Sequence, residues 1–164
     1  SHRGLGGVID LMVENGIRAS EVTKVRIGFP PGADEPLVYD DPQTGLQGKF
    51  SAQYPVAAIL LDGKLDLQSF TDEMVCRPAV REWLTKVERY RVPDSKVYSG
   101  TVGYTDVSIS TKRGEFSRRI DKGPGSSAWP MSAADHKDKF MGCAQVALSP
   151  SRACELMEKV ETVE

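Results

Sequence analysis

The chain has 164 residues, enough for one domain or for a compact domain with an appendage. Its 21 basic and 23 acidic residues leave a net charge of −2, so the sequence lacks the strongly basic field that attracts nucleic acid or an anionic membrane. Hydrophobic residues make up 40% of the chain but form no apolar run near ~18 residues, so no membrane-spanning helix is predicted. We therefore expect neither nucleic acid nor membrane as a partner.

The cysteine and histidine content points away from disulfides and metal sites. Cys76, Cys143 and Cys154 are odd in number and widely spaced, which is typical of free thiols in a reducing compartment. Because His2 and His136 are the only histidines and no CxxC or HxxxH pattern occurs, we expect no bound metal. The N-terminus has no signal-peptide pattern, so the predicted location is cytoplasmic. Ser1 and His2 look like the remnant of an expression tag, so we expect the chain to be a fragment.

The first third of the chain predicts a helix, a strand and a long loop. Apolar residues at helical spacing predict a helix over 6–16, closed by Gly16. Alternating apolar residues predict a strand over 22–29. Residues 30–48 contain four prolines and no period, which indicates an irregular loop. A loop of this length indicates a functional or interface role.

The middle of the chain is predicted to be helical. A short apolar helix follows the loop, with Ser51 as its cap and Gly63 at its end. Residues 64–75 indicate one or two short helical turns. A further helix is predicted over 77–87, because Pro78 suits a first turn and the apolar residues lie on one face.

The period then changes to two, which predicts strands over 87–92, 101–111 and 115–120. Lys112, Arg113 and Gly114 join the last two strands as a tight hairpin. Two more helices are predicted over 132–147 and 149–163, beginning at Ser132 and at Ser149-Pro150. Because helices and strands do not alternate regularly, the predicted class is α+β, with a small, mainly antiparallel sheet and helices packed on one face.

Two polar motifs are not predicted to form a binding or catalytic site. The glycine-rich stretch 122–127 lacks the spacing of a phosphate-binding loop, and Pro124 removes a backbone donor, so a plain turn is predicted. His136 lies in the mixed-charge stretch 135–139, which is typical of a solvated helix face. No Ser/His/Asp or Cys/His arrangement can be built from these residues.

The stretch "GKFSAQYPVAAILLDG" (48–63) is the best candidate for a site. Lys49 and Ser51, together with the free amides of a helix start, form a local positive cluster that suits a carboxylate. Tyr54, whose hydroxyl has an ordinary pKa near ~10, is the group there that could donate a proton. An ordinary interpretation stays open, in which Lys49 is solvated, Ser51 is only a cap and Tyr54 packs beneath Phe50.

The same stretch resembles a motif of the MmgE/PrpD family: a basic residue, an aromatic or His, Ser-x-x-Tyr, a helix of small residues and a terminal Leu-Asp-Gly. Three further stretches resemble the family in the same order, and the resemblance runs along essentially the whole chain. They are "RGLGGVIDLMVENG", "SISTKRGEFSRRID" and "KGPGSSAWPMSAADHKDKF".

The resemblance implies both a fold and an activity. The family contains 2-methylcitrate dehydratase, which acts in propionate metabolism, cis-aconitate decarboxylase and iminodisuccinate epimerase. Its members have a large helical domain and a smaller α+β lid, usually as homodimers. This chain resembles the lid, over 1–146, and the start of the helical return, over 147–164; the N-terminal helical domain is then missing as a partner.

The resemblance also implies roles for four residues. Tyr54 matches the family's active-site Tyr, and Lys49, Ser51 and Arg3 are candidate contacts for the carboxylates of a small polycarboxylate substrate. The implied chemistry needs no cofactor: a proton is taken next to a carboxylate, and water or CO2 leaves or the carbon is reprotonated. The family often has His at the position of Gly6, and a small apolar residue at that of Pro55, so the substrate stays open.

Alone, the fragment is expected to be inactive, because the family's catalytic histidines and Asp lie mostly in the missing part. Two other functions stay open from the sequence. One is a non-catalytic module that binds a small acid or a protein, and the other is a dimerisation domain.

Overall fold

The computed structural model of the chain describes residues 2–94, 96–98 and 103–162. These fall into two compact units, Ser1–Pro124 and Gly125–Glu164, and each is described by itself. The boundary between the units lies after Pro124, whereas the predicted domain boundary lies after residue 146.

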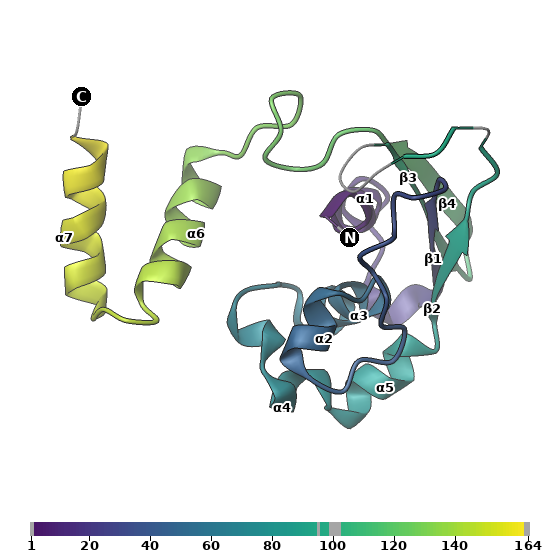
Figure 1. Cartoon of the computed structure of the whole chain (residues 1–164), viewed down its shortest axis with the longest axis horizontal. Coiled ribbons are helices and arrows are strands. Elements are labelled where there is room, and N and C mark those ends of the chain that lie inside the picture. The colour runs from purple at the N-terminus through teal and green to yellow at the C-terminus, as the bar shows by residue number, and fades with distance from the viewer. Residues whose placement is uncertain (1, 95, 99–102, 163–164) are drawn as a thin grey trace. The chain divides into compact units, whose positions relative to one another are not determined.

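The first unit contains a four-stranded sheet with helices packed against one face, so the predicted α+β class is confirmed (Figure 1). The strand order is β2-β1-β3-β4; β1 pairs with β2 in parallel, and the other two pairs are antiparallel. The strands are β1 (Val22–Phe29), β2 (Val87–Arg91), β3 (Thr105–Thr111) and β4 (Gly114–Ile120).

The α helices of this unit are α1 (His2–Glu14), α2 (Gly45–Lys49), α3 (Gln53–Asp62), α4 (Asp72–Val75) and α5 (Pro78–Leu84). Two single 3-10 turns, η1 (Ala19–Glu21) and η2 (Gln68–Phe70), complete it. The short turns predicted over 64–75 are confirmed as η2 and α4. The predicted hairpin is confirmed as well, since β3 ends at Thr111 and β4 begins at Gly114. Residues 101 and 102 of the predicted third strand lie outside the described residues.

Helix α1 begins at His2, before the predicted start at residue 6. Its first turns contain glycines, whose low helix propensity hides them from a pattern based on apolar spacing. The structure shows why Gly7 is there: a Cβ at this position would lie 2.8 Å from Ile120 and 2.9 Å from Val107. The glycine therefore lets α1 approach β3 and β4 closely.

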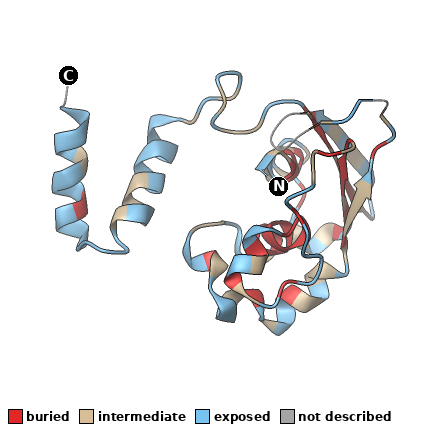
Figure 2. Ribbon diagram, viewed as in Figure 1, coloured by how far each residue is buried: buried red, intermediate tan, exposed pale blue. Residues whose placement is uncertain are grey.

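The core lies between the sheet and the helices (Figure 2). Alternate residues of β1 and β3 enter it, among them Val25, Ile27, Val107 and Ile109. Helix α3 contributes buried residues all round, as expected of a helix that is apolar on every side. It ends at Gly63, whose φ of 70° gives the left-handed cap that the sequence predicts.

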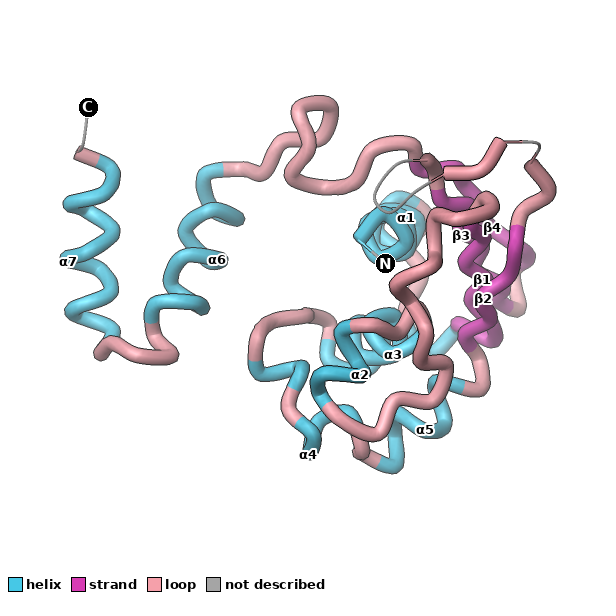
Figure 3. Tube along the Cα trace, viewed as in Figure 1, coloured by secondary structure: helices cyan, strands magenta, loops and turns pink. Residues whose placement is uncertain are grey.

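The long loop predicted over 30–48 is irregular only as far as residue 44 (Figure 3). The prediction is wrong for its end, where the short helix α2 forms. Thr44 caps this helix by accepting a hydrogen bond from the Gln47 N–H at 3.2 Å. The Asp72 carboxylate of α4 accepts another from the Gly45 N–H at 2.7 Å. A tertiary contact thus stabilises a helix that two glycines would otherwise disfavour.

The second unit contains two helices, α6 (Ala133–Ala144) and α7 (Pro150–Glu161), which pack against each other. The predicted caps are confirmed: the Ser132 Oγ accepts from the Asp135 N–H at 3.1 Å, and Ser149 caps α7. Ala153 is the buried residue of these helices, and α6 has none among its described residues. Residue 163 of the predicted last helix lies outside the described part of the chain.

Candidate functional site

The stretch 48–63 forms a junction between two helices rather than the start of one. Helix α2 ends at Lys49, and α3 begins at Gln53. The Phe50 N–H donates to the Gln47 carbonyl at 3.0 Å, and the Ser51 N–H donates to the Gly48 carbonyl at 3.3 Å. The expectation that Lys49 flanks the amides of the α3 start is therefore corrected: Lys49 is the last residue of α2, where the helix dipole favours a cation.

Ser51 lies beneath this junction and is fully buried. Its Oγ accepts a hydrogen bond from the Tyr54 N–H at 3.1 Å, in the first turn of α3, but the N-cap of α3 is Ala52 rather than the predicted Ser51. The same hydroxyl donates to the Gln53 Oε1 at 3.5 Å. Both interactions are internal, and in this structure the Ser51 side chain faces the protein rather than solvent.

Tyr54 lies in the core, with 0% of its surface exposed. Its ring meets Phe70 edge-on at 5.7 Å between centroids, and Val75 and Val80 belong to the same cluster. The hydroxyl donates to the Ser69 carbonyl. Burial raises the pKa of Tyr54 above its ordinary value, so the hydroxyl stays protonated at neutral pH.

This environment does not present Tyr54 to a ligand. Its hydroxyl joins α3 to the turn at 66–70, which is further fixed by hydrogen bonds of 3.1 Å between the Asp66 N–H and Ser69 Oγ and between the Ser69 N–H and Asp66 Oδ1. The role of Tyr54 as a proton donor stays a prediction, and it would require this turn to move.

Arg3 belongs to a different part of the unit. It lies in the first turn of α1, and its Nε donates to the Asp121 carbonyl at 3.1 Å. The neighbouring His2 Nε2 donates to the Pro124 carbonyl at 2.7 Å. The structure thus brings Lys49, Ser51 and Tyr54 together at one junction and places Arg3 beside the segment that follows β4.

Lys49 is the exposed member of the junction, and no ion pair joins it to another residue within the described ranges. Two apolar residues lie close to it in the chain: Leu46 in α2 and Phe50, the C-cap of α2, are four residues apart, and both are exposed. Tyr39, also exposed, belongs to the neighbouring loop, and its N–H donates to the Phe50 carbonyl at 3.2 Å. We call Tyr39, Leu46, Lys49 and Phe50 the junction face.

Sequence reasoning missed the apolar part of the junction face, because Leu46 and Phe50 fell on either side of the predicted end of the loop. Their spacing of four residues was the signal that could have found it. Exposed apolar side chains beside a cation make the junction face a candidate for contact with a ligand or another surface.

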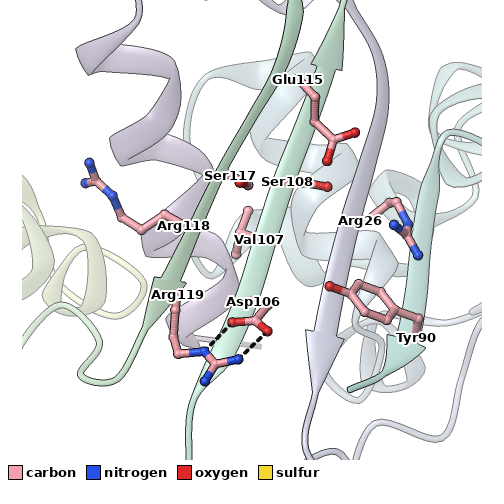
Figure 4. Close-up of a pocket in the computed structure, with 9 residues that line it drawn as sticks. All are labelled: Arg26, Tyr90, Asp106, Val107, Ser108, Glu115, Ser117, Arg118 and Arg119. Carbon is pink, nitrogen blue, oxygen red and sulfur yellow. Dashed lines mark hydrogen bonds and ion pairs between the residues drawn. The ribbon is translucent and has the colours of Figure 1, made fainter. Parts of the chain in front are cut away.

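A second polar region lies on the helix-free face of the sheet (Figure 4). Its floor is formed by Ser108 and Ser117, which are cross-strand neighbours. Charged and aromatic side chains from four strands surround them: Arg26, Tyr90, Asp106, Glu115 and Arg119. These are the outward positions of strands whose alternation the sequence does show.

The charges on this face largely satisfy one another. Arg119 donates two hydrogen bonds to the Asp106 carboxylate, at 2.7 and 2.9 Å. Arg26 lies 4.4 Å from the centre of the Tyr90 ring and 3.4 Å from the Glu88 carboxylate. Because cations and carboxylates balance here, the face is less suited to a polyanionic ligand than the junction face.

Other expectations concern metal ions, thiols and membranes. In the part of the chain that the structure describes, no three His, Cys, Asp or Glu side chains come together as a possible metal site. The three cysteines are free, as predicted, and all three are exposed. His136 is exposed, as predicted for a solvated helix face. No described helix is both long and apolar enough to cross a membrane.

Comparison with known proteins finds a family model that matches the whole chain. Residues 1–164 match the model of the MmgE/PrpD C-terminal domain. Cis-aconitate decarboxylase from Mus musculus is 35% identical over 124 residues, which cover 75% of this chain and 25% of that protein. The protein of the same name from Homo sapiens is 34% identical over 119 residues, covering 72% of this chain and 24% of that protein. The chain thus aligns with about a quarter of the length of these relatives, and it belongs to the MmgE/PrpD family as a C-terminal domain.

Proposed function

We propose that this chain is the lid-like, substrate-contacting part of a cofactor-independent lyase or isomerase that acts on a small di- or tricarboxylic acid. Family membership supports a lyase-type domain, and the two relatives are named cis-aconitate decarboxylases. Cis-aconitate and 2-methylcitrate are therefore the first substrates to test. The free thiols fit a cytoplasmic enzyme.

The junction face is the observation that carries this proposal. Lys49 offers an exposed ammonium beside Leu46 and Phe50, and it has no ion pair among the described residues. A small polycarboxylic acid has the matching chemistry, because its carboxylates need cations and its carbon skeleton gains from apolar contact. On closing over a bound acid, such a surface would supply charge and exclude water.

The other candidate residues take supporting places in this proposal. Arg3 lies apart from the junction, beside Asp121, and stays a predicted substrate contact on the strength of the family resemblance alone. Ser51 would hold the junction from beneath, through its bond to the Tyr54 N–H. Tyr54 is kept as the proton donor implied by the family resemblance, and its hydroxyl would reach a substrate when the 66–70 turn releases it from Ser69.

The second unit supports the proposal that a further helical part accompanies this chain. It leaves apolar residues exposed, among them Val146 and Leu148 in the turn between α6 and α7 and Leu156 and Val160 on α7. Two helices with so little buried between them gain stability by packing on another surface. We propose that the covering surface is an N-terminal helical domain of the same protein, which would form a homodimer.

The experiment is an assay of this chain alone and of the protein encoded together with the region upstream of it. We expect the chain alone to be inactive and the longer protein to release CO2 from cis-aconitate or water from 2-methylcitrate. Lys49→Ala should raise KM about tenfold, which is the scale of one lost charge-assisted contact.

Lys112→Ala is the matched control, because Lys112 is also exposed but lies in the β3–β4 hairpin. An unchanged KM for Lys49→Ala would remove the junction face from the site. Absence of turnover with every di- and tricarboxylate tested, together with tight binding of one of them, would favour the non-catalytic module instead.

A further inference from the structure

We infer that Arg89 is a positioning residue for the junction face: it acts through Asp40 and Gln53 to fix the end of α2 that carries Lys49. This inference rests on the proposed function. It adds a residue on β2, distant in sequence from the junction, that neither the motif nor the family comparison singles out.

Arg89 reaches from the sheet into the loop that precedes α2. It pairs with Ile27 across β1 and β2, and 23% of its side chain is exposed. Its Nη1 donates to the Leu37 carbonyl and lies 3.5 Å from the Asp34 carboxylate. Its Nη2 lies 3.1 Å from the Asp40 Oδ1. One guanidinium thus holds the loop at three points, which its planar set of donors allows and a lysine ammonium does not.

Asp40 passes this contact on to the junction. The same Oδ1 accepts a hydrogen bond from the Gln53 Nε2 at 2.9 Å. Gln53 is the first residue of α3 and is buried, and its Oε1 accepts from the Ser51 hydroxyl. Ser51 in turn accepts a hydrogen bond from the Tyr54 N–H. A continuous polar chain therefore runs from β2 to Ser51, two residues after Lys49 at the end of α2.

A second arginine holds the rest of the loop independently. Arg81 of α5 pairs with Asp41 and donates to the Pro42 and Val75 carbonyls. Because this anchor does not involve Arg89, loss of Arg89 should displace the junction locally rather than unfold the unit. Sub-ångström placement matters for a residue that meets a substrate carboxylate.

The test uses the longer protein with cis-aconitate as substrate and compares Arg89→Lys, Arg89→Ala and Asp40→Asn. We expect KM to rise about fivefold to tenfold in each, while kcat stays within about twofold, because a mispositioned binding group weakens substrate and transition state alike. Arg119→Lys is the matched control: it also replaces an arginine that pairs with an aspartate, but on the helix-free face of the sheet. Its KM should not change.

A double variant shows whether Arg89 acts through Lys49. If it does, Arg89→Ala combined with Lys49→Ala should have the KM of Lys49→Ala alone, since the positioned group is already gone. A general structural defect would instead multiply the two effects. Multiplicative effects, or an unchanged KM in the Arg89 variants while Lys49→Ala raises it, would overturn the inference and leave the proposed function intact.

Two further measurements test the inference when the Arg89 variants do not fold or when no substrate is known. If the Arg89 variants fail to fold, Asp40→Asn tests the inference by itself, because 63% of the Asp40 side chain is exposed and the fold should tolerate its loss. A raised KM of this variant supports the inference, and an unchanged KM refutes it. Hydrogen exchange gives an answer without any substrate. The amides of residues 45–54 should exchange faster in Arg89→Lys than in the wild type, and those of β4 should exchange at the same rate in both. An unchanged exchange rate of residues 45–54 in the variant would contradict the positioning role, whether or not the proposed function holds.

Discussion

Helix α3 is buried on every side, whereas α7 exposes nearly its whole surface apart from Ala153. α3 is apolar on nearly every side and packs within its own unit, between the sheet and α5, whereas α7 is polar apart from one apolar stripe. The apolar side chains of α7 have no such cover among the described residues. The difference shows that the first unit has its own core, while Ala153 is the buried residue among the described helical residues of the second unit.

The largest expected effect comes from removing the buried aromatic side chain in the first turn of α3. Tyr54→Ala should lower the free energy of unfolding of the 164-residue chain by about 3–5 kcal/mol, because a fully buried aromatic leaves a cavity. Denaturation in urea measures the change. Val160→Ala on α7 is the control and should cost less than about 0.5 kcal/mol. Equal losses of unfolding free energy in the two variants would contradict the difference in burial between α3 and α7.

A smaller effect is expected from the ion pair at the end of α3. Arg77 donates to both oxygens of Asp62, at 3.0 and 2.6 Å, and these bonds hold the pKa of Asp62 below its usual value. Asp62→Asn should therefore cost about 1–2 kcal/mol near pH 7. The folded pKa is the lower one, so the stabilisation is complete above the unfolded value of 3.8 and disappears as the pH falls through the folded value.

Unfolding curves at a series of pH values measure this effect. Wild type and Asp62→Asn should converge at the acid end. The exposed pair of Arg152 and Glu155 on α7 gives the comparison, since Glu155→Gln should change stability by no measurable amount. A difference between wild type and Asp62→Asn that persists at the lowest pH would rule out the ion pair as its source.

The smallest effect on stability comes from the Tyr54 hydroxyl alone. Tyr54→Phe should cost about 1 kcal/mol, since it removes one buried hydrogen bond to Ser69. Because burial raises the pKa of Tyr54 in the folded chain, the unfolded chain ionises first, and the free energy of unfolding falls above about pH 10. Tyr54→Phe should lack the part of this decrease that comes from the Tyr54 hydroxyl. In the longer protein, a loss of turnover of tens-fold or more would identify Tyr54 as a proton donor. Unchanged turnover would leave it a structural residue of the core.

The sequence predicted the fold well where one principle dominates. The alternation of Val25 with Ile27 marked β1, and Gly63 marked the end of α3. The prediction failed where long-range contacts compensate for weak local preference. α2 depends on Asp72, and the first two turns of α1 contain glycines, of which Gly7 allows the close approach to β3 and β4. Neither contact can be read from neighbouring residues.

The candidate site was predicted in part. The motif placed Lys49, Ser51 and Tyr54 close together, but it could not say that the side chains point in different directions. Burial separates them: Lys49 is exposed, and Ser51 and Tyr54 lie in the core. The contribution of Arg89 could not be predicted, because it depends on which loop the parallel strand β2 lies against.

The most direct measurement of the central claim is the reactivity of the Lys49 amine in the longer protein. An amine-specific reagent and mass spectrometry would follow labelling of Lys49 with and without cis-aconitate, using Lys64, exposed and paired with Asp66, as the internal reference. A substrate that binds at the junction face should slow the labelling of Lys49 severalfold and leave that of Lys64 unchanged. Equal labelling of Lys49 with and without a saturating substrate would contradict the account.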